Sequence, residues 1–371
     1  MAKIKVLIVD DSAVVRQVLK EILSKDPQIE LIGSAADPIF AERYLKKDWP
    51  DVIILDLEMP RMDGITFLKK LMAEHPTPVV ICSTLSKEGA QVTMEAISSG
   101  AVEIITKPEM GLKGFLEESA ARFIHSVKGA AAAKVGKIAG MQKRKPETVV
   151  LKKKPPVGPF AKVAPKLSAD AVISSHGGSP LGSTTDKVIA IGASTGGTQS
   201  LEIVLRSLPV DCHGIVIVQH MPENFTAAFS QRLNEVCKIT VKEAEDGDRI
   251  IRGRAIVAHG DKHLAIKRSG AQYRLQVLDG PLVSRHRPSV DVLFRSAAKE
   301  AGKNAMGVLM TGMGDDGAAG LLEMKNTGAK TYAQDEDTSI VFGMPAEAIK
   351  RGAVLEVVSL YQIAKKIVQF S

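Results

Sequence analysis

The stretch VIAIGASTGGTQS, residues 188–200, is the part of the chain from which the rest can best be interpreted. An apolar run stops at Gly192, and a glycine-rich turn then leads into a segment with helical character. A buried strand that feeds a tight turn and a helix is typical of α/β proteins, which present reactive groups at the edge of a sheet. The stretch therefore predicts a parallel α/β domain with a functional site at this turn.

Two motifs compete for the turn. Gly192-x-Ser194-x-Gly196 fits the G-x-S-x-G nucleophile elbow, in which the serine hydroxyl stands exposed on the turn. The same residues nearly fit the dinucleotide fingerprint G-x-G-x-x-G, but Ser194 replaces its middle glycine. That glycine lets a pyrophosphate approach the backbone, so a side chain at this position weakens the nucleotide interpretation.

Two later strands end in polar residues of complementary chemistry. Apolar runs at 214–218 and 305–310 predict buried strands that lie parallel to the first one. The side chains that follow the three strand ends are Ser194, His220, and Asp315 or Asp316. Because parallel strands share one carboxyl edge, we expect these side chains to converge. Histidine can take the proton of a serine, and a carboxylate can orient the imidazole, which is the machinery of acyl transfer.

The nucleotide interpretation needs an acidic residue at the end of the second strand, and the chain has Gln219-His220 there. The order serine, histidine, aspartate also differs from that of the α/β-hydrolases. Residues 238–278 alternate between short apolar runs and turns, which predicts short strands and a hairpin. We expect a Rossmann-like parallel sheet with a hairpin.

The first 125 residues predict a separate domain. Five short apolar strands alternate with amphipathic helices, the pattern of a doubly wound, flavodoxin-like parallel sheet. The strands end in Asp10 and Asp11, Asp56, Ser83 and Lys107. Three carboxylates at one edge favour a hard cation such as Mg²⁺, and a lysine beside them can neutralise phosphoryl oxygens. Asp56 is a candidate phosphoryl acceptor.

Composition narrows the classes of protein further. The net charge of +7 is concentrated in residues 126–186, which are rich in lysine and proline, and the rest of the chain is close to neutral. This pattern predicts a solvated, flexible linker and no nucleic-acid groove. No apolar run reaches the length of a membrane span and the chain does not begin with a secretory signal, so we expect a cytoplasmic protein with no membrane insertion. The three cysteines lack metal or redox spacing.

Residues 3–122 resemble a response-regulator receiver domain. The motifs that carry the resemblance are Asp10-Asp11, Asp56, the Met59-Pro60-x-Met62-Asp63-Gly64 loop, Ser83 and Lys107-Pro108. The resemblance implies that a histidine kinase phosphorylates Asp56 and that Asp10, Asp11 and Asp56 hold Mg²⁺. It also implies that Ser83 and Lys107 are switch residues.

Residues 187–369 resemble the catalytic domain of the CheB-type chemotaxis methylesterases. The matching motifs are IGASTGG at 191–197, QHMP at 219–222, LMTGMGDDG at 309–317, AQD at 333–335 and GMP at 343–345. The resemblance implies that Ser194 is the nucleophile, His220 the base and Asp316 the orienting carboxylate. Thr195 and Met313 would be supporting residues on the oxyanion side.

Together the two resemblances imply a receiver domain at 1–125, a linker at 126–186 and a methylesterase domain at 187–371. They imply a monomeric enzyme of chemotaxis adaptation that hydrolyses glutamate methyl esters of chemoreceptors, deamidates receptor glutamines and uses no cofactor for the ester reaction. The main alternative is a phosphorylation-switched module that binds a ligand at the glycine-rich turn without catalysis. A DNA-binding output is disfavoured because the sequence lacks a helix-turn-helix with a basic recognition helix.

Overall fold

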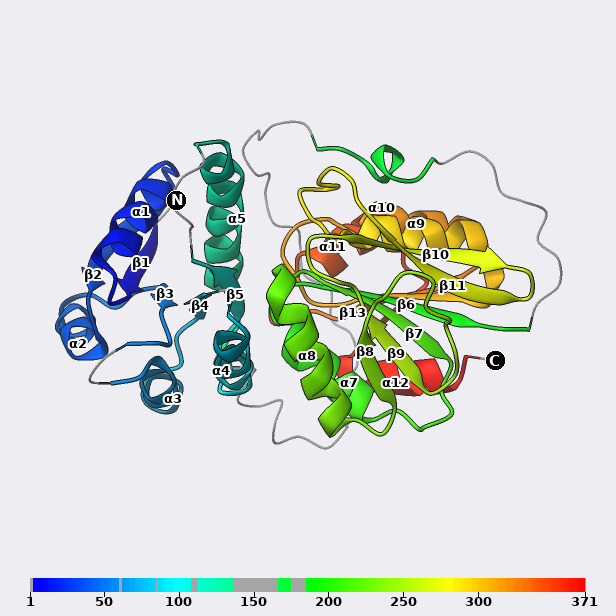
Figure 1. Cartoon of the computed structure of the whole chain (residues 1–371), viewed down its shortest axis with the longest axis horizontal. Coiled ribbons are helices and arrows are strands. Elements are labelled where there is room, and N and C mark those ends of the chain that lie inside the picture. The colour runs from blue at the N-terminus through cyan, green and yellow to red at the C-terminus, as the bar shows by residue number, and fades with distance from the viewer. Residues whose placement is uncertain are drawn as a thin grey trace.

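The computed structural model describes residues 3–59, 62–84, 86–107, 113–136, 166–174 and 185–370. They form two α/β domains that lie side by side (Figure 1). The first domain has a fully parallel sheet in the order β2-β1-β3-β4-β5. Its strands are β1 (Ile4–Val9), β2 (Ile29–Ala35), β3 (Val52–Leu55), β4 (Val79–Ser83) and β5 (Glu103–Thr106). Its helices are α1 (Ala13–Ser24), α2 (Pro38–Lys47), α3 (Gly64–Glu74), α4 (Lys87–Ser98) and α5 (Lys113–Ala131).

Polar side chains cap four of these helices. Ser12, Asp37, Asp63 and Ser86 accept hydrogen bonds from the backbone N–H groups of Val15, Phe40, Thr66 and Gly89. Such caps satisfy donors that the first helical turn leaves free. The central strands β1, β3 and β4 are almost wholly buried, as a parallel sheet covered by helices on both faces requires.

The second domain has a parallel sheet of seven strands in the order β14-β13-β12-β6-β7-β9-β8. Its strands are β6 (Val188–Ala193), β7 (Gly214–Gln219), β8 (Thr240–Glu243), β9 (Arg254–Val257), β12 (Ala305–Leu309), β13 (Lys330–Gln334) and β14 (Glu356–Val358). A separate antiparallel hairpin pairs β10 (His263–Ser269) with β11 (Gln272–Leu278). The helices are α7 (Gly197–Arg206), α8 (Glu223–Val236), α9 (Val290–Glu300), α10 (Ala318–Asn326), α11 (Met344–Lys350) and α12 (Leu360–Val368).

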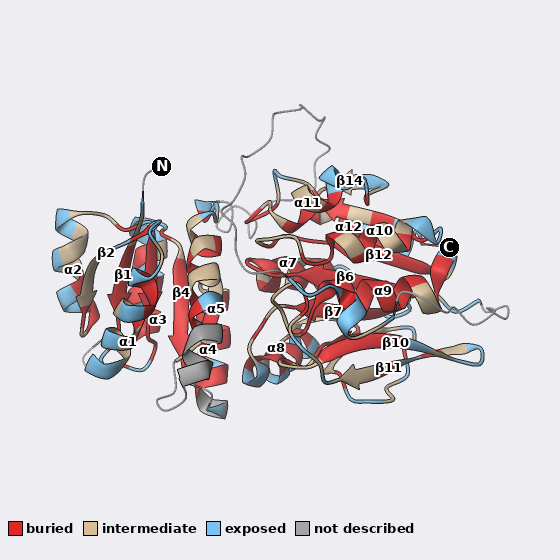
Figure 2. Ribbon diagram, turned by 90° about the horizontal axis from the view of Figure 1, so that it is seen from above, coloured by how far each residue is buried: buried red, intermediate tan, exposed pale blue. Residues whose placement is uncertain are grey.

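The predicted fold class is confirmed in both domains, including the hairpin. Strand β6 lies between β7 and β12. The strands that follow β6 directly in the chain, β7 to β9, lie on one side of it, and the later strands β12, β13 and β14 lie on the other side. The carboxyl ends of β6 and β12 therefore flank a topological switch point, where open α/β sheets bind their ligands. In Figure 2 the strands of both sheets are mostly buried, and exposed residues gather on outer surfaces such as α1 and α2.

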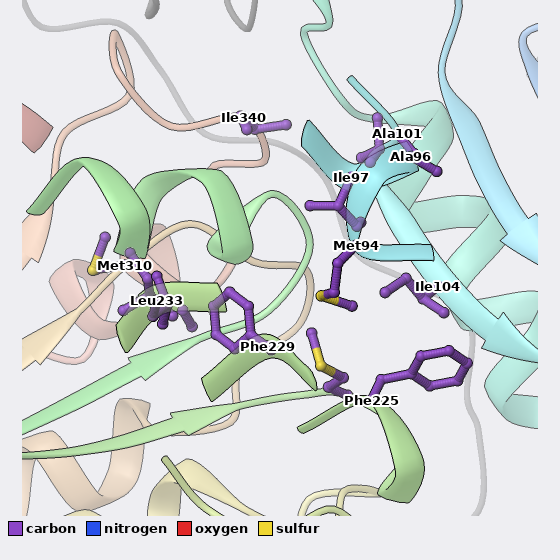
Figure 3. Close-up of a cluster of buried hydrophobic side chains, with 14 of the residues drawn as sticks. Met94, Ala96, Ile97, Ala101, Ile104, Phe225, Phe229, Leu233, Met310 and Ile340 are labelled. Atoms are coloured by element: carbon purple, nitrogen blue, oxygen red, sulfur yellow. The ribbon is translucent and has the colours of Figure 1, made fainter. Parts of the chain in front are cut away.

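The two domains share an apolar interface. One continuous cluster of buried side chains contains Met94 and Ile97 of α4, Ile104 of β5, and Phe225 and Phe229 of α8. Figure 3 shows these side chains from the two domains gathered in one cluster. In this interface α4 of the first domain packs against α8, the helix that follows β7.

The connector between the domains departs in part from the flexible tether predicted for 126–186. Helix α5 continues to Ala131, and Lys134 then donates its backbone N–H to Ile340 O at 3.0 Å. Residues 166–174, with a short 3-10 helix at Ala169–Ala171, lie against the second domain. The remaining expectations for the linker concern 137–165 and 175–184, which lie outside the described residues. Among the described helices, none combines the length and the apolarity needed to cross a membrane.

Candidate active site

The turn after β6 holds Ser194 and Thr195 between two strands. Gly196 adopts φ 74°, a left-handed conformation that glycine tolerates best. A Cβ atom on Gly197 would lie 2.1 Å from Oε1 of Gln219, so the helix starts only because this residue has no side chain. Ser194 donates its backbone N–H to Thr311 O at 3.0 Å. The turn is thus fixed to β12 on one side and to the end of β7 on the other.

Asp316 is completely buried and fully hydrogen-bonded. It accepts the hydroxyl proton of Ser289 at 2.7 Å and the backbone N–H groups of Val290 and Asp291 at 2.7 and 3.0 Å, at the start of α9. Burial alone would raise the pKa of Asp316. The contacts with His220, the neighbouring His286 and the Ser289 hydroxyl instead hold that pKa below its ordinary value. Asp316 is therefore a stable anion in the interior.

His220 faces this carboxylate. Its Nε2 atom lies 2.8 Å from Oδ2 of Asp316, and because the carboxylate is ionised, Nε2 carries the proton and donates it. Its Nδ1 atom is buried and has no hydrogen-bond partner among the described residues, so it retains a lone pair. Ser194 and His220 line the same small cavity, yet no hydrogen bond joins their side chains. Serine–histidine contacts of this kind often tighten only when substrate binds.

The structure separates the two adjacent aspartates. Asp315 lies at the surface, where it pairs with Lys166 and lies 3.6 Å from Arg351. Asp316 points inward to His220, so the sequence-predicted group of Ser194, His220 and Asp316 comes together and Asp315 does not join it.

Three side chains around His220 and Asp316 were not predicted from the sequence. The ring of His286 stacks on that of His220, with centroids 3.7 Å apart and an interplanar angle of 6°. His125 of α5 packs edge-on against His286 at 5.5 Å. Burial and the proximity of His220 lower the pKa of both, to about 4 for His125, so both are neutral at physiological pH. Ser289, which immediately precedes α9, is the third. The place of His125 depends on the contact between the domains, so no sequence pattern pointed to it.

The first domain reaches directly into the turn that holds Ser194. Gln199 donates its side-chain amide to the carbonyls of Ile97 and Ala101 at 3.2 and 2.7 Å, and Gly196 donates its N–H to Val102 O at 3.3 Å. Thr195 donates its hydroxyl to Oε2 of Glu103 at 2.7 Å. Burial raises the pKa of Glu103 to about 7, and the hydrogen bond from Thr195 only partly offsets this.

Met313 lies next to the same interface. A Cβ atom on Gly129 of α5 would lie 3.0 Å from Oγ1 of Thr195 and 3.4 Å from the sulfur of Met313. The backbone of α5 therefore packs directly onto both residues that the family resemblance assigns to the oxyanion side. Thr195 is buried in this arrangement, and Met313 is half-buried.

The acidic cluster of the first domain also assembles. Ligand atoms of Asp10, Asp11 and Asp56 lie within 4.8 Å of one another. The ammonium group of Lys107 lies 2.6 Å from Asp56 and 3.4 Å from Asp10. Burial raises the pKa of Asp10 and Asp56 despite the opposing charge of Lys107. Oδ2 of Asp10, the oxygen that lies 3.4 Å from Lys107, is buried without a hydrogen-bond partner in the described residues. Three carboxylates, one of which has an unsatisfied oxygen, fit a divalent cation.

Ser83 is buried at the end of β4, and Asp63 caps α3. Pro60 and Pro108, which also carried the receiver resemblance, lie outside the described residues. The order of strands brings Asp10, Asp56, Ser83 and Lys107 to one edge, as predicted.

Residues 166–174, which we call the strap, pack beside the loop that carries His286. Lys166 pairs with Asp315, and Leu167 O accepts the backbone N–H of Ser284 at 3.0 Å. Ala169 is buried in a cluster with Val283 and Val292. The guanidinium group of Arg295 donates to Ile173 O at 3.2 Å. The strap thus touches both the residue before Asp316 and the loop before Ser289.

Comparisons with known proteins agree across the chain. Residues 6–113 match the response-regulator receiver domain model, and residues 189–367 match the CheB methylesterase model. The chain is 59% identical to protein-glutamate methylesterase/protein-glutamine glutaminase 3 of Shewanella oneidensis, over 99% of both chains. It is 56% identical to a protein of the same name from Geobacter metallireducens, over 100% of this chain and 99% of the relative.

A solved structure supports the second domain. The catalytic domain of Thermotoga maritima CheB methylesterase is 35% identical, with a TM-score of 0.50, and matches 51% of this chain and all of that one.

Proposed function

The chain belongs to the CheB methylesterase family, and from that membership we propose how its two sites work. The enzyme hydrolyses γ-methyl esters of glutamate on chemoreceptors and deamidates receptor glutamines, in the cytoplasm and as a monomer. A histidine kinase supplies the phosphoryl group that controls it. The observation that carries the proposal is the ionised, buried Asp316 hydrogen-bonded to His220, which lines the same cavity as Ser194 and whose Nδ1 has no hydrogen-bond partner among the described residues.

Ester hydrolysis begins when Oγ of Ser194 attacks the ester carbonyl carbon and His220 takes the hydroxyl proton. Asp316 stabilises the imidazolium that forms, because it remains a carboxylate. The tetrahedral intermediate collapses as the methoxy group leaves with the proton from His220, which gives methanol and an acyl-enzyme. Water, deprotonated by His220, then attacks the acyl carbon and releases the glutamate side chain and the serine.

Deamidation follows the same course with ammonia as the leaving group. Both reactions place negative charge on the former carbonyl oxygen. Hydrogen-bond donors beside the turn that holds Ser194 must stabilise this charge. Thr195 and Met313 are the residues that we assign to this side, because both lie beside Ser194 and under α5.

In the receiver, Asp10, Asp11 and Asp56 would hold Mg²⁺, which would neutralise the charge on a phosphoryl group entering at Asp56. Lys107 lies between Asp10 and Asp56, so it can bind a phosphoryl oxygen at the same edge, and Ser83 is the hydroxyl nearest to that role at the end of β4. Phosphorylation of Asp56 would weaken the contact between the domains and expose Ser194.

A serine-directed fluorophosphonate tests the nucleophile. We expect it to label Ser194 after phosphodonor treatment, and we expect Ser194→Ala to lose both labelling and methanol release while its thermal unfolding stays unchanged. A folded Ser194→Ala variant that still releases methanol at the original rate would disprove the assignment.

A further inference from the structure

The receiver contributes one acidic side chain to the cavity of the nucleophile. Glu103 opens β5, and its carboxylate accepts the hydroxyl proton of Thr195, the residue next to Ser194. Glu103 and Ser194 line the same cavity, together with His220. The space left there is about 10 Å³, which is too small for more than a single water molecule. A glutamate side chain thus lines the cavity of the reactive serine and contacts the residue next to that serine.

A glutamate is an unexpected choice for a purely structural contact here. Within the described residues Glu103 forms no ion pair, and its surroundings disfavour the charged form. A glutamine has the same reach and would accept the Thr195 hydroxyl without burying a carboxyl group. The product of the proposed reaction is a glutamate side chain of a protein. Glu103 presents the same γ-carboxyl group at this position.

The backbone next to Glu103 is hydrogen-bonded to the second domain. The carbonyls of Ala101 and Val102 accept hydrogen bonds from Gln199 and Gly196, in the turn and helix that follow Ser194. Three consecutive receiver residues therefore engage the nucleophile turn, two through the main chain and the third through its side chain.

We propose that Glu103 is an internal stand-in for the reaction product, and that it occupies the subsite that receives the glutamyl side chain of the substrate. This inference rests on the proposed function and deepens it, because it assigns Thr195 as the hydroxyl that binds the substrate's γ-carbonyl group. The receiver then inhibits by filling a specific subsite in addition to covering it.

The test measures how fast a fluorophosphonate labels Ser194 in the full-length, unphosphorylated chain. Glu103→Ala empties the subsite, and we expect labelling about tenfold faster than in wild type. Glu103→Gln keeps the length and an oxygen acceptor, so at pH 6, below the raised pKa of Glu103, it should label as slowly as wild type. Glu95→Ala, which removes an exposed glutamate of α4 paired with Lys69, is the matched control and should leave the rate unchanged.

Small ligands identify the subsite. N-acetylglutamine amide and N-acetylglutamate amide should each slow the labelling of Glu103→Ala again. N-acetylnorvaline amide, which has the same side-chain length without oxygens, should not. The protection should disappear in Glu103→Ala/Thr195→Val. Unfolding curves of all variants show that each remains folded.

Two results would overturn the inference. One is equal labelling rates in Glu103→Ala and wild type, and the other is equal protection by the glutamyl and norvalyl ligands. Failure of the proposed function looks different, since Ser194 would then resist labelling in every variant, with and without phosphodonor.

Discussion

At the scale of single residues, the electrostatic design of the site centres on Asp316. Its two oxygens accept four hydrogen bonds, of which one comes from His220 and three come from the start of α9. The partial positive charge of a helix N-terminus further favours the anion. The same helix start holds Asp291, whose pKa is raised by burial and by the charge of Asp316. The charge of Asp316 thus favours the neutral form of Asp291, while the contacts with His220 and Ser289 keep Asp316 itself ionised.

Ser289 is the residue whose loss best tests this design. Ser289→Ala removes one donor to a buried carboxylate, an interaction worth about 1.5–3 kcal/mol, so we expect kcat for methanol release to fall by about tenfold or more. Ser296→Ala, another buried serine of α9 that accepts the N–H of Ile266, serves as the control and should keep its kcat. Equal kcat in wild type and Ser289→Ala would contradict the role of Ser289.

The site residues that could be predicted from the sequence are those that follow the end of a strand. Ser194, His220 and Asp316 are set by three strand ends of one parallel sheet, and the topology brings such ends together. His286, His125 and Glu103 follow no such rule, because their positions depend on loop conformation and on how two domains meet. The choice between Asp315 and Asp316 also needed coordinates, since adjacent residues differ only in the direction of their side chains.

At the scale of elements, α5 and the strap both pack against the catalytic domain. Helix α5 packs its backbone at Gly129 against Thr195 and Met313, and its His125 packs against His286. The strap supports the loop that carries His286. The alternation of strands and helices was predictable because each has a strong apolar period. The docking of the strap was not, because its few apolar residues lie within a lysine- and proline-rich linker.

A bulky side chain on α5 should push the domains apart. We expect Gly129→Trp to raise the basal rate of Ser194 labelling by roughly fivefold or more, since overpacking of a close contact costs about 1–3 kcal/mol. Gly136→Trp is the matched control, because a Cβ atom at Gly136 meets no atom within 4 Å. If both variants label at the wild-type rate, α5 does not hold the closed arrangement.

The strap should affect the reactivity of Ser194 even when the receiver has moved away from the catalytic domain. Replacing residues 166–174 by nine Gly and Ser residues removes the ion pair to Asp315 and the support for Ser284. We expect Ser194 labelling in the presence of phosphodonor to slow roughly tenfold, because these contacts together are worth about 1–2 kcal/mol. The same replacement at 157–165 should change nothing. Identical rates for the two replacements would mean that the strap is a passive linker.

At the scale of the whole molecule, the contact between the domains should respond to pH. The pKa of Glu103 is raised to about 7 in the closed arrangement, so a proton binds more tightly there than in an open one. Closure is therefore favoured at low pH, and this advantage is lost as the pH rises through about 7. Linkage gives a weakening of closure of up to about tenfold between pH 6 and pH 8.

The ratio of basal to phosphodonor-activated labelling isolates this effect from the pH dependence of catalysis. We expect the ratio to rise from pH 6 to pH 8 in wild type and to stay flat in Glu103→Gln. A ratio that rises equally in both proteins would show that another group controls closure.

The central claim is that chemistry at Asp56 governs access to Ser194, although the two residues belong to different domains. Methanol release from a methylated chemoreceptor, measured with and without a small phosphodonor, tests it most directly. We predict that phosphodonor accelerates release by the wild-type chain and leaves Asp56→Asn at its slow basal rate. Equal release with and without phosphodonor, or equal activation of Asp56→Asn, would contradict the claim.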